Sequence, residues 1–126
     1  MPHITLDYSA NLDSDVPMDA VCAAVRDAAL ATGVFETGAV RVRALRADAY
    51  AIADGASRNA YVDGVLRMGI GRDEATRRQV GAAIFDALKT CFAAQLETDA
   101  FALSFEVREI DGAFSFKTNT MHARFR

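Results

Sequence analysis

Tryptophan is absent from the 126-residue sequence, and cysteine, histidine and proline occur only twice each. Cys22 and Cys91 lie far apart in alanine-rich stretches, so we expect no disulfide and predict two reduced, buried thiols. Two histidines and two scattered cysteines cannot supply a conventional zinc site, so no bound metal is expected. No linker rich in proline, glycine or serine divides the chain, and residues 1–126 are predicted to form one domain.

Long apolar runs and basic clusters are missing too. No stretch approaches the ~18 consecutive apolar residues of a membrane span. The first residues, Met1 to Ile4, have neither the basic nor the apolar region of a signal peptide, so the expected location is the cytoplasm. Fourteen lysines and arginines against seventeen acidic residues give a net charge of −3. Phosphate binding needs clustered positive charge, so we expect neither a nucleic-acid nor a membrane partner.

The sequence does contain segments in which apolar and polar residues alternate. Four such segments are predicted as strands: His3–Tyr8, Ala39–Arg46, Ala60–Ile70 and Phe101–Ile110. A short terminal strand is predicted at Phe114–Phe116. The region Ala47–Asn59 is predicted to be irregular, because it shows no period and contains the turn signal Asp54-Gly55.

Two other segments repeat apolar residues at the helical period. The first helix is predicted to be capped by Asp15, to carry Pro17 in its first turn and to end at Gly33. The second is predicted to start after the cap residue Asp73 and to keep its apolar stripe as far as Leu96.

The elements therefore follow the order strand, helix, strand twice, with an offset of roughly 60 residues between the halves, about 1–58 and 59–126. Each half is a β-α-β unit whose two strands should be parallel. We predict an α+β fold with a four-stranded mixed sheet and two helices on one face. The other face of the sheet carries charged side chains together with their aliphatic portions. Because sheets with parallel strands are rarely bare on one face, we expect an oligomer.

Pro2 is the first candidate for chemistry. Removal of Met1 is expected before so small a residue, and it would leave a free secondary amine on a rigid ring. Such an amine is a base without a flexible side chain. A proline is also simply a common second residue, so Pro2 carries little weight by itself.

Arg41 and Arg43 form the second candidate, because they lie on one face of a predicted strand. Guanidinium groups that face inward need anionic partners. The partner is either a substrate anion or a carboxylate, namely Asp7, Glu106 or one from a neighbouring subunit. For Arg43 alone the structural role is favoured.

The third candidate is the segment Gly69–Asp73 between a predicted strand and a helix. It is not a dinucleotide-binding fingerprint, because Glu74 stands where the third glycine would be. A glycine-containing loop that leads into a helix still presents backbone N–H groups that can bind an anion. Arg72 adds a planar guanidinium suited to a carboxylate. The alternative is an ordinary tight turn with a solvated arginine.

Taken in order, several motifs resemble the 5-carboxymethyl-2-hydroxymuconate isomerases of the tautomerase superfamily. The resemblance covers nearly the whole chain and rests on these segments: Met1-Pro2-His3, Leu30–Phe35, Val40–Arg43, Ala53–Gly55, Gly69–Arg72, Leu103–Glu106 and Phe116–Ala123. Residues 56–66 match the family less well.

This resemblance implies a homotrimer with active sites at subunit boundaries and no cofactor. It implies Pro2 as the catalytic base, with Arg41, Arg72 and Arg43 binding the substrate. The implied reaction converts a 2-hydroxy-2,4-diene diacid into the 2-oxo-3-ene, a step of bacterial homoprotocatechuate breakdown. Two alternatives stay open: a tautomerase of another 2-oxo acid such as phenylpyruvate, and a catalytically silent binding trimer.

Overall fold

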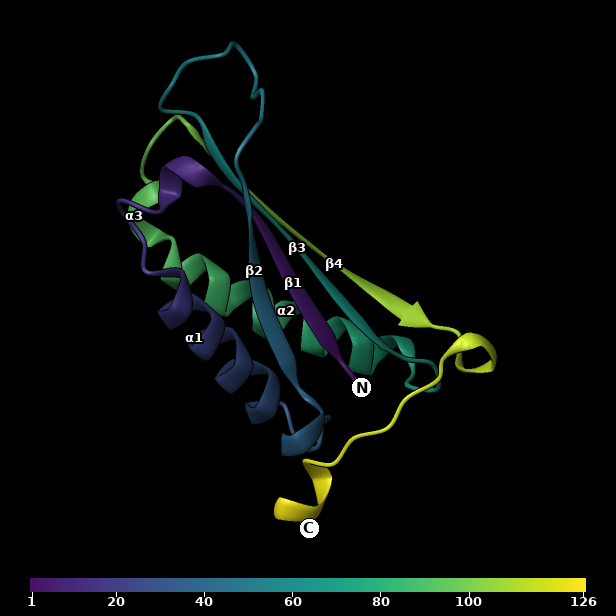
Figure 1. Ribbon diagram of the computed structural model, residues 1–126. Helices are drawn as coiled ribbons and strands as arrows, with labels where there is room; N and C mark the ends of the chain where they lie inside the picture. The colour runs from purple at the N-terminus through teal and green to yellow at the C-terminus, as the bar shows by residue number, and fades with distance from the viewer.

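The computed structural model describes residues 1–126. The four strands of its sheet are β1 (His3–Ser9), β2 (Arg41–Ala47), β3 (Ala60–Gly69) and β4 (Phe101–Ile110). The helices are α1 (Met18–Ala31), α2 (Glu74–Cys91) and the short α3 (Ala93–Leu96). Single 3-10 turns, η1 to η4, occupy Ala10–Leu12, Thr37–Ala39, Gly112–Phe114 and His122–Arg124. Figure 1 shows α1 and α2 on the same face of the sheet.

The sheet has the strand order β2-β1-β3-β4 and is mixed. β1 pairs with β2 and β3 with β4 in parallel, while the two central strands, β1 and β3, are antiparallel. Each parallel pair is one β-α-β unit, so the predicted duplication and the predicted fold are confirmed. This order leaves β1 in the middle of the sheet, and the chain therefore starts at the end of a central strand.

The core lies between the sheet and the two helices. Ile4 and Leu6 of β1 are fully buried, as are Val25 of α1 and Ile84 of α2. These positions follow the predicted alternation of the strands and the predicted stripes of the helices. Burying each such side chain contributes roughly 1.5–3 kcal/mol, so the repeated pattern accounts for the layered arrangement.

The predicted start of the second helix is confirmed, and that of the first is wrong. The Asp73 carboxylate accepts a hydrogen bond from the backbone N–H of Thr76 at 2.8 Å, as a helix cap does. Asp15 caps nothing, because α1 begins only at Met18 after an extended Pro17. The preceding turn continues as far as the buried Val16, and Pro17 fits the cap position because it has no N–H to satisfy.

Two predictions for the C-terminal half of the chain are also wrong. The second helix stops before Leu96, because Phe92 leaves helical geometry, is fully buried and stacks on Phe101 with ring centroids 5.4 Å apart. Phe114–Phe116 forms no strand. The Asp111 side chain instead accepts a hydrogen bond from the N–H of Ala113 at 2.9 Å and starts the η3 turn. Residues 112–126 then form a tail that runs past the N-terminus (Figure 1).

The remaining sequence expectations concern the cysteines, the loop and membrane insertion. Cys22 and Cys91 are free, as predicted, but only partly buried, and this burial raises the pKa of each thiol. Residues 48–59 contain no helix or strand, in agreement with the predicted irregular region. None of the helices combines the length and the apolar character that crossing a membrane requires.

Gly64 offers a test of the packing between the central strands and β4. A Cβ at this position would lie 2.7 Å from Cδ2 of Phe105 and 3.1 Å from Cδ2 of Leu6. We expect Gly64→Ala to destabilise the fold by roughly 1–3 kcal/mol, because the added methyl group would overlap the Phe105 ring and press on the fully buried Leu6 side chain. Urea unfolding measures the change. Gly112→Ala is the matched control, since nothing lies within 4 Å of its Cβ. Equal stabilities for the two variants would contradict this account.

Candidate active site

The N-terminus is held at the end of the central strand β1. Pro2 is buried, and its carbonyl oxygen accepts a hydrogen bond from the backbone N–H of Arg41 at 3.2 Å. This bond extends the pairing of β1 with β2 beyond the first strand residue, His3. Pro2 therefore has a fixed position at the edge of the layer between sheet and helices.

A cavity of about 560 Å³ opens beside Pro2. We call it the proline cavity. Its walls come from the start of the chain, the segment after α1, the loop after β3 and the tail. They are Met1, Pro2, Val34, Phe35, Glu36, Ala39, Gly69, Ile70, Arg72, Lys117, His122 and Arg126.

Arg72 is directed into this cavity by the glycine-containing turn. Gly71 has a φ of 118°, a conformation that other residues rarely adopt, and it turns the chain sharply before α2. The Arg72 guanidinium lies over the Phe35 ring at 5.6 Å and donates a hydrogen bond to the Val34 carbonyl at 3.4 Å. It has no carboxylate partner. The loop therefore supplies a positioned, unpaired cation beside Pro2.

The tail closes the other side of the cavity. The Asn119 amide donates to the Gly38 carbonyl at 2.8 Å, and the His122 backbone and ring pack against Gly38 so closely that a Cβ there would lie 3.1 Å away. Glu36 accepts a hydrogen bond from Arg126 at 2.7 Å. These contacts attach the tail to the segment before β2 and bring Lys117 to the first residue of the chain.

Positive charge consequently surrounds the N-terminal amine. Burial lowers the pKa of the Met1 α-amino group below its usual 8.0, and the nearby cations Lys117, Arg72 and Arg41 lower it further. Each cation repels the protonated form of the amine but not the neutral form. At neutral pH a larger fraction of the amine is therefore uncharged and able to accept a proton.

Of the predicted site residues, the fold brings Pro2 and Arg72 into one cavity and leaves the other two arginines outside it. Arg41 donates to the Ala39 carbonyl at 2.6 Å, and its side chain lies in a shallow hollow between β2 and α1. Arg43 is exposed on the bare face of the sheet, with Nη1 3.5 Å from Nδ1 of His3.

The predicted carboxylate partners of these two arginines are engaged elsewhere. Asp7 accepts a hydrogen bond from the Tyr61 hydroxyl at 2.7 Å, and Glu106 is paired with Arg108 at 3.0 Å. Arg41 and Arg43 therefore have no ion pair within their own chain.

Most of the cations that lack an ion pair lie at the end of the sheet where the chain begins. Eight of the fourteen lysines and arginines are paired with a carboxylate. The six unpaired cations are Arg41, Arg43, Arg67, Arg72, Lys117 and Arg124. All but Arg124 lie around the first three residues of the chain, on the adjoining strands, the loop after β3 or the tail. The arrangement is suited to an anionic ligand next to an amine.

No group of three or more His, Cys, Asp or Glu side chains that could hold a metal ion is found.

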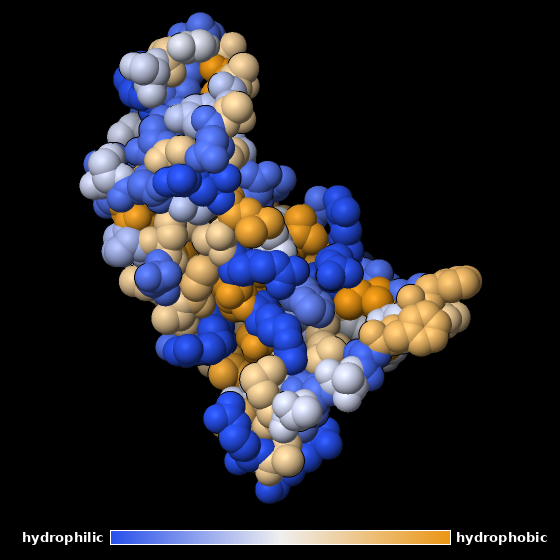
Figure 2. Space-filling view, viewed as in Figure 1, coloured by the Kyte–Doolittle hydropathy of each residue, from blue (hydrophilic) through white to orange (hydrophobic).

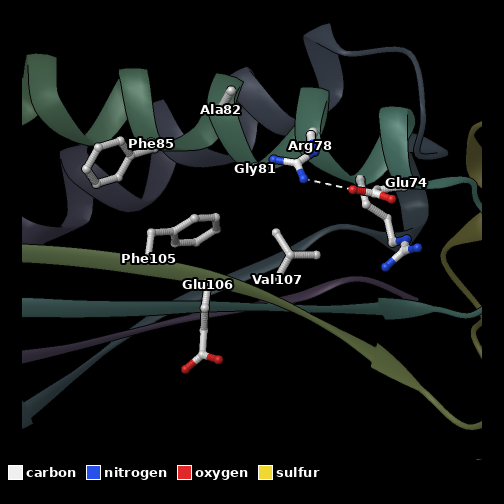
Figure 3. Close-up of a pocket in the computed structure, with 9 residues that line it drawn as sticks. Glu74, Arg78, Gly81, Ala82, Phe85, Phe105, Glu106 and Val107 are labelled. Carbon is white, nitrogen blue, oxygen red and sulfur yellow. Dashed lines mark hydrogen bonds and ion pairs between the residues drawn. The ribbon is translucent and has the colours of Figure 1, made fainter.

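A groove of about 390 Å³ between α2 and the edge strand β4 is an alternative site (Figure 3). Phe85 and Phe105 face into it. Its charged groups are already neutralised, because Arg78 is paired with Glu74 at 2.8 Å and Arg77 is also paired with a carboxylate. The groove therefore offers apolar surface but no free charge, and we assign it no reaction.

Comparisons with known proteins identify the family to which the chain belongs. Residues 2–125 match the family described as 5-carboxymethyl-2-hydroxymuconate isomerase. The 5-carboxymethyl-2-hydroxymuconate Delta-isomerase of Escherichia coli is 36% identical over 126 residues, which span all of both chains. The crystal structure of a 5-carboxymethyl-2-hydroxymuconate isomerase from Deinococcus radiodurans R1 has a TM-score of 0.92 at 35% identity, covering 99% of this chain and 94% of that one.

A more distant likeness concerns the fold alone. A fused 4-OT symmetric trimer has a TM-score of 0.64 at 13% identity, covering 96% of this chain and 98% of that one. The fold is thus tautomerase-like, as predicted. The chain belongs to the 5-carboxymethyl-2-hydroxymuconate isomerase family, and it is an enzyme of the isomerase class.

Lys117 was not predicted from the sequence, and its effect on the amine can be measured. In protein that retains Met1, we expect Lys117→Met to raise the pKa of the Met1 α-amino group toward 8.0, because a repelling charge is removed. The pH dependence of amine acylation, followed by mass spectrometry of the N-terminal peptide, reports this pKa. Arg124→Met removes an unpaired cation outside the cavity and should leave the pKa unchanged. Identical titrations for both variants would show that Lys117 does not act on the amine.

Proposed function

We propose that the chain catalyses the ketonisation of 5-carboxymethyl-2-hydroxymuconate or a similar dienol diacid in the cytoplasmic breakdown of homoprotocatechuate. The observation that carries this proposal is the proline cavity, which joins Pro2 to the unpaired cations Arg72 and Lys117. The relative from Escherichia coli bears the name of this reaction over the same length of chain, which supports the same substrate class here.

Pro2 is the proposed base, after Met1 has been removed. Its secondary amine takes the proton from the 2-hydroxyl group of the dienol and returns a proton to a carbon of the diene. One O–H bond breaks, one C–H bond forms and the double bonds shift, so no electrons are gained or lost. The reaction needs no redox partner and no cofactor. The surrounding cations support this role, because they favour the neutral amine that must accept the proton.

Arg72 is proposed to bind the carboxylate beside the reacting enol. A guanidinium can donate two parallel hydrogen bonds to a carboxylate and can stabilise charge that develops on the enolate oxygen. The Phe35 ring below it keeps the guanidinium in place and limits the access of water to that side.

Arg41 and Arg43 are proposed to act across a subunit boundary in a homotrimer. Both lack a carboxylate within their own chain, and the sheet face that carries Arg43 is uncovered. Figure 2 shows hydrophilic and hydrophobic residues intermixed on this side of the molecule and a hydrophobic tip where the tail begins. Leu45, which alternates with Arg43 onto the same face of β2, is 53% exposed, which favours contact with another copy of the chain.

Replacing Pro2 tests the base directly. Pro2→Ala keeps an amine but makes it primary and flexible, so we expect kcat/KM to fall by roughly tenfold or more. Protein that retains Met1 has no free amine at residue 2 and should lose roughly 100-fold or more. An ultraviolet assay of ketonisation on 2-hydroxymuconate-type acids, with the N-terminus verified by intact mass, measures both. Undiminished turnover in both proteins would rule out Pro2 as the base.

Replacing Arg72 tests the carboxylate contact. Arg72→Met should lower kcat/KM by roughly 100-fold or more, because charge on the carboxylate and enolate is left unpaired. Arg72→Lys should recover only part of the activity, since a lysine cannot form the two parallel hydrogen bonds. The same assay applies, with circular dichroism to verify folding. Full activity in Arg72→Met would remove Arg72 from the mechanism, and activity on phenylpyruvate alone would favour the other tautomerase reaction.

A further inference from the structure

A second cavity, of about 510 Å³, lies beside the proline cavity. We call it the tail cavity. The two cavities share Met1, Gly69, Ile70 and Lys117, so they meet at the start of the chain. A ligand that extends beyond the proline cavity on this side enters the tail cavity. Nothing in the mechanism above uses it.

Arg67 gives the tail cavity a free positive charge. This arginine is exposed on the bare face of β3, opposite His3 of β1 and Arg108 of β4. Arg108 is neutralised by Glu106, whereas Arg67 has neither an ion pair nor a side-chain hydrogen bond. Burial and the charges of Arg67, Arg43 and Arg41 lower the pKa of His3, so the ring adds no positive charge to the cavity at neutral pH and leaves Arg67 without an anionic partner. An anion in this cavity therefore meets Arg67 on one side and Lys117 on the other.

Apolar side chains complete the walls. Ile70, Ile110, Phe114 and Phe116 line the same cavity, and Phe114 and Phe116 are 82% and 94% exposed. Two cations beside aliphatic and aromatic surface suit a carboxylate at the end of a short hydrocarbon chain. A small inorganic anion would leave the apolar walls uncovered.

We propose that the tail cavity is the subsite for the distal carboxylate of the substrate, held by Arg67 and Lys117. The inference rests on the proposed function, because it takes the reacting enol to lie beside Pro2 and Arg72. The proline cavity then holds the part common to all 2-oxo acids. The tail cavity decides which of them are good substrates, and it favours those with a second carboxylate.

Arg67→Met tests the assignment with paired substrates. The dienol diacid 2-hydroxymuconate should show a KM raised about tenfold or more, because its distal carboxylate loses a charged partner. The monoacid 2-hydroxypenta-2,4-dienoate, which lacks that carboxylate, should change less than about twofold. Lys117→Met should also raise the KM of the diacid more than that of the monoacid. Arg67→Lys keeps the charge and should restore most of the binding. Arg124→Met is the control and should alter neither substrate.

A binding measurement tests the carboxylate subsite independently of the proposed catalytic activity. Calorimetric titration of the saturated acids hexanedioate and hexanoate requires no turnover. Wild-type protein should bind the diacid more tightly, and Arg67→Met should abolish most of that difference. If the wild-type enzyme converts neither dienol, the proposed function fails, and the calorimetric result alone decides whether the subsite exists. Equal effects of Arg67→Met on diacid and monoacid, in turnover or in calorimetry, would overturn the assignment.

Discussion

Repulsion among positive charges that lack carboxylate partners is the constraint on which this molecule depends. Five such cations gather around one chain end, although the protein as a whole has a net charge of −3. The other lysines and arginines, with the exception of Arg124, are paired with carboxylates of the same chain. Like charges held close together destabilise a fold unless an anion is present to bind them. Burial and the same repulsion lower the pKa of the Met1 α-amino group, so the charges that disfavour protonation of this amine also attract anions to it.

The duplicated β-α-β fold explains how this arrangement is built. Because β1 is central, the chain begins between neighbouring strands and not at a free edge. β2 contributes Arg41 beside it, β3 contributes Arg67 and then Arg72 from the following turn, and the tail returns with Lys117. Groups far apart in sequence thus converge on the start of the chain, while the two long helices cover one face of the sheet and stabilise it.

Most of the strands and helices could be predicted from the sequence, because the spacing of apolar residues along a short segment differs between a strand and a helix. Alternation located all four strands, and the Asp73 cap fixed the start of α2. The glycine turn drew attention to Arg72, and the fold places this arginine in the proline cavity. The tail could not be predicted, because it has no period and is held by contacts such as Asn119 with Gly38, which lie 81 residues apart. Lys117 was missed for the same reason. The break at Phe92 depends on its stacking with Phe101, which no helical stripe reveals.

The contact between the tail and the first residue has a practical meaning for handling the protein. Met1 and Arg126 line the same cavity, and the Asn119 amide lies 3.5 Å from the sulfur of Met1. An affinity tag or fluorescent fusion attached after Arg126 would start from the wall of the cavity, and one attached before Met1 would acylate the amine. An internal insertion in residues 48–59, at the far end of the sheet, is the better place for a label (Figure 1).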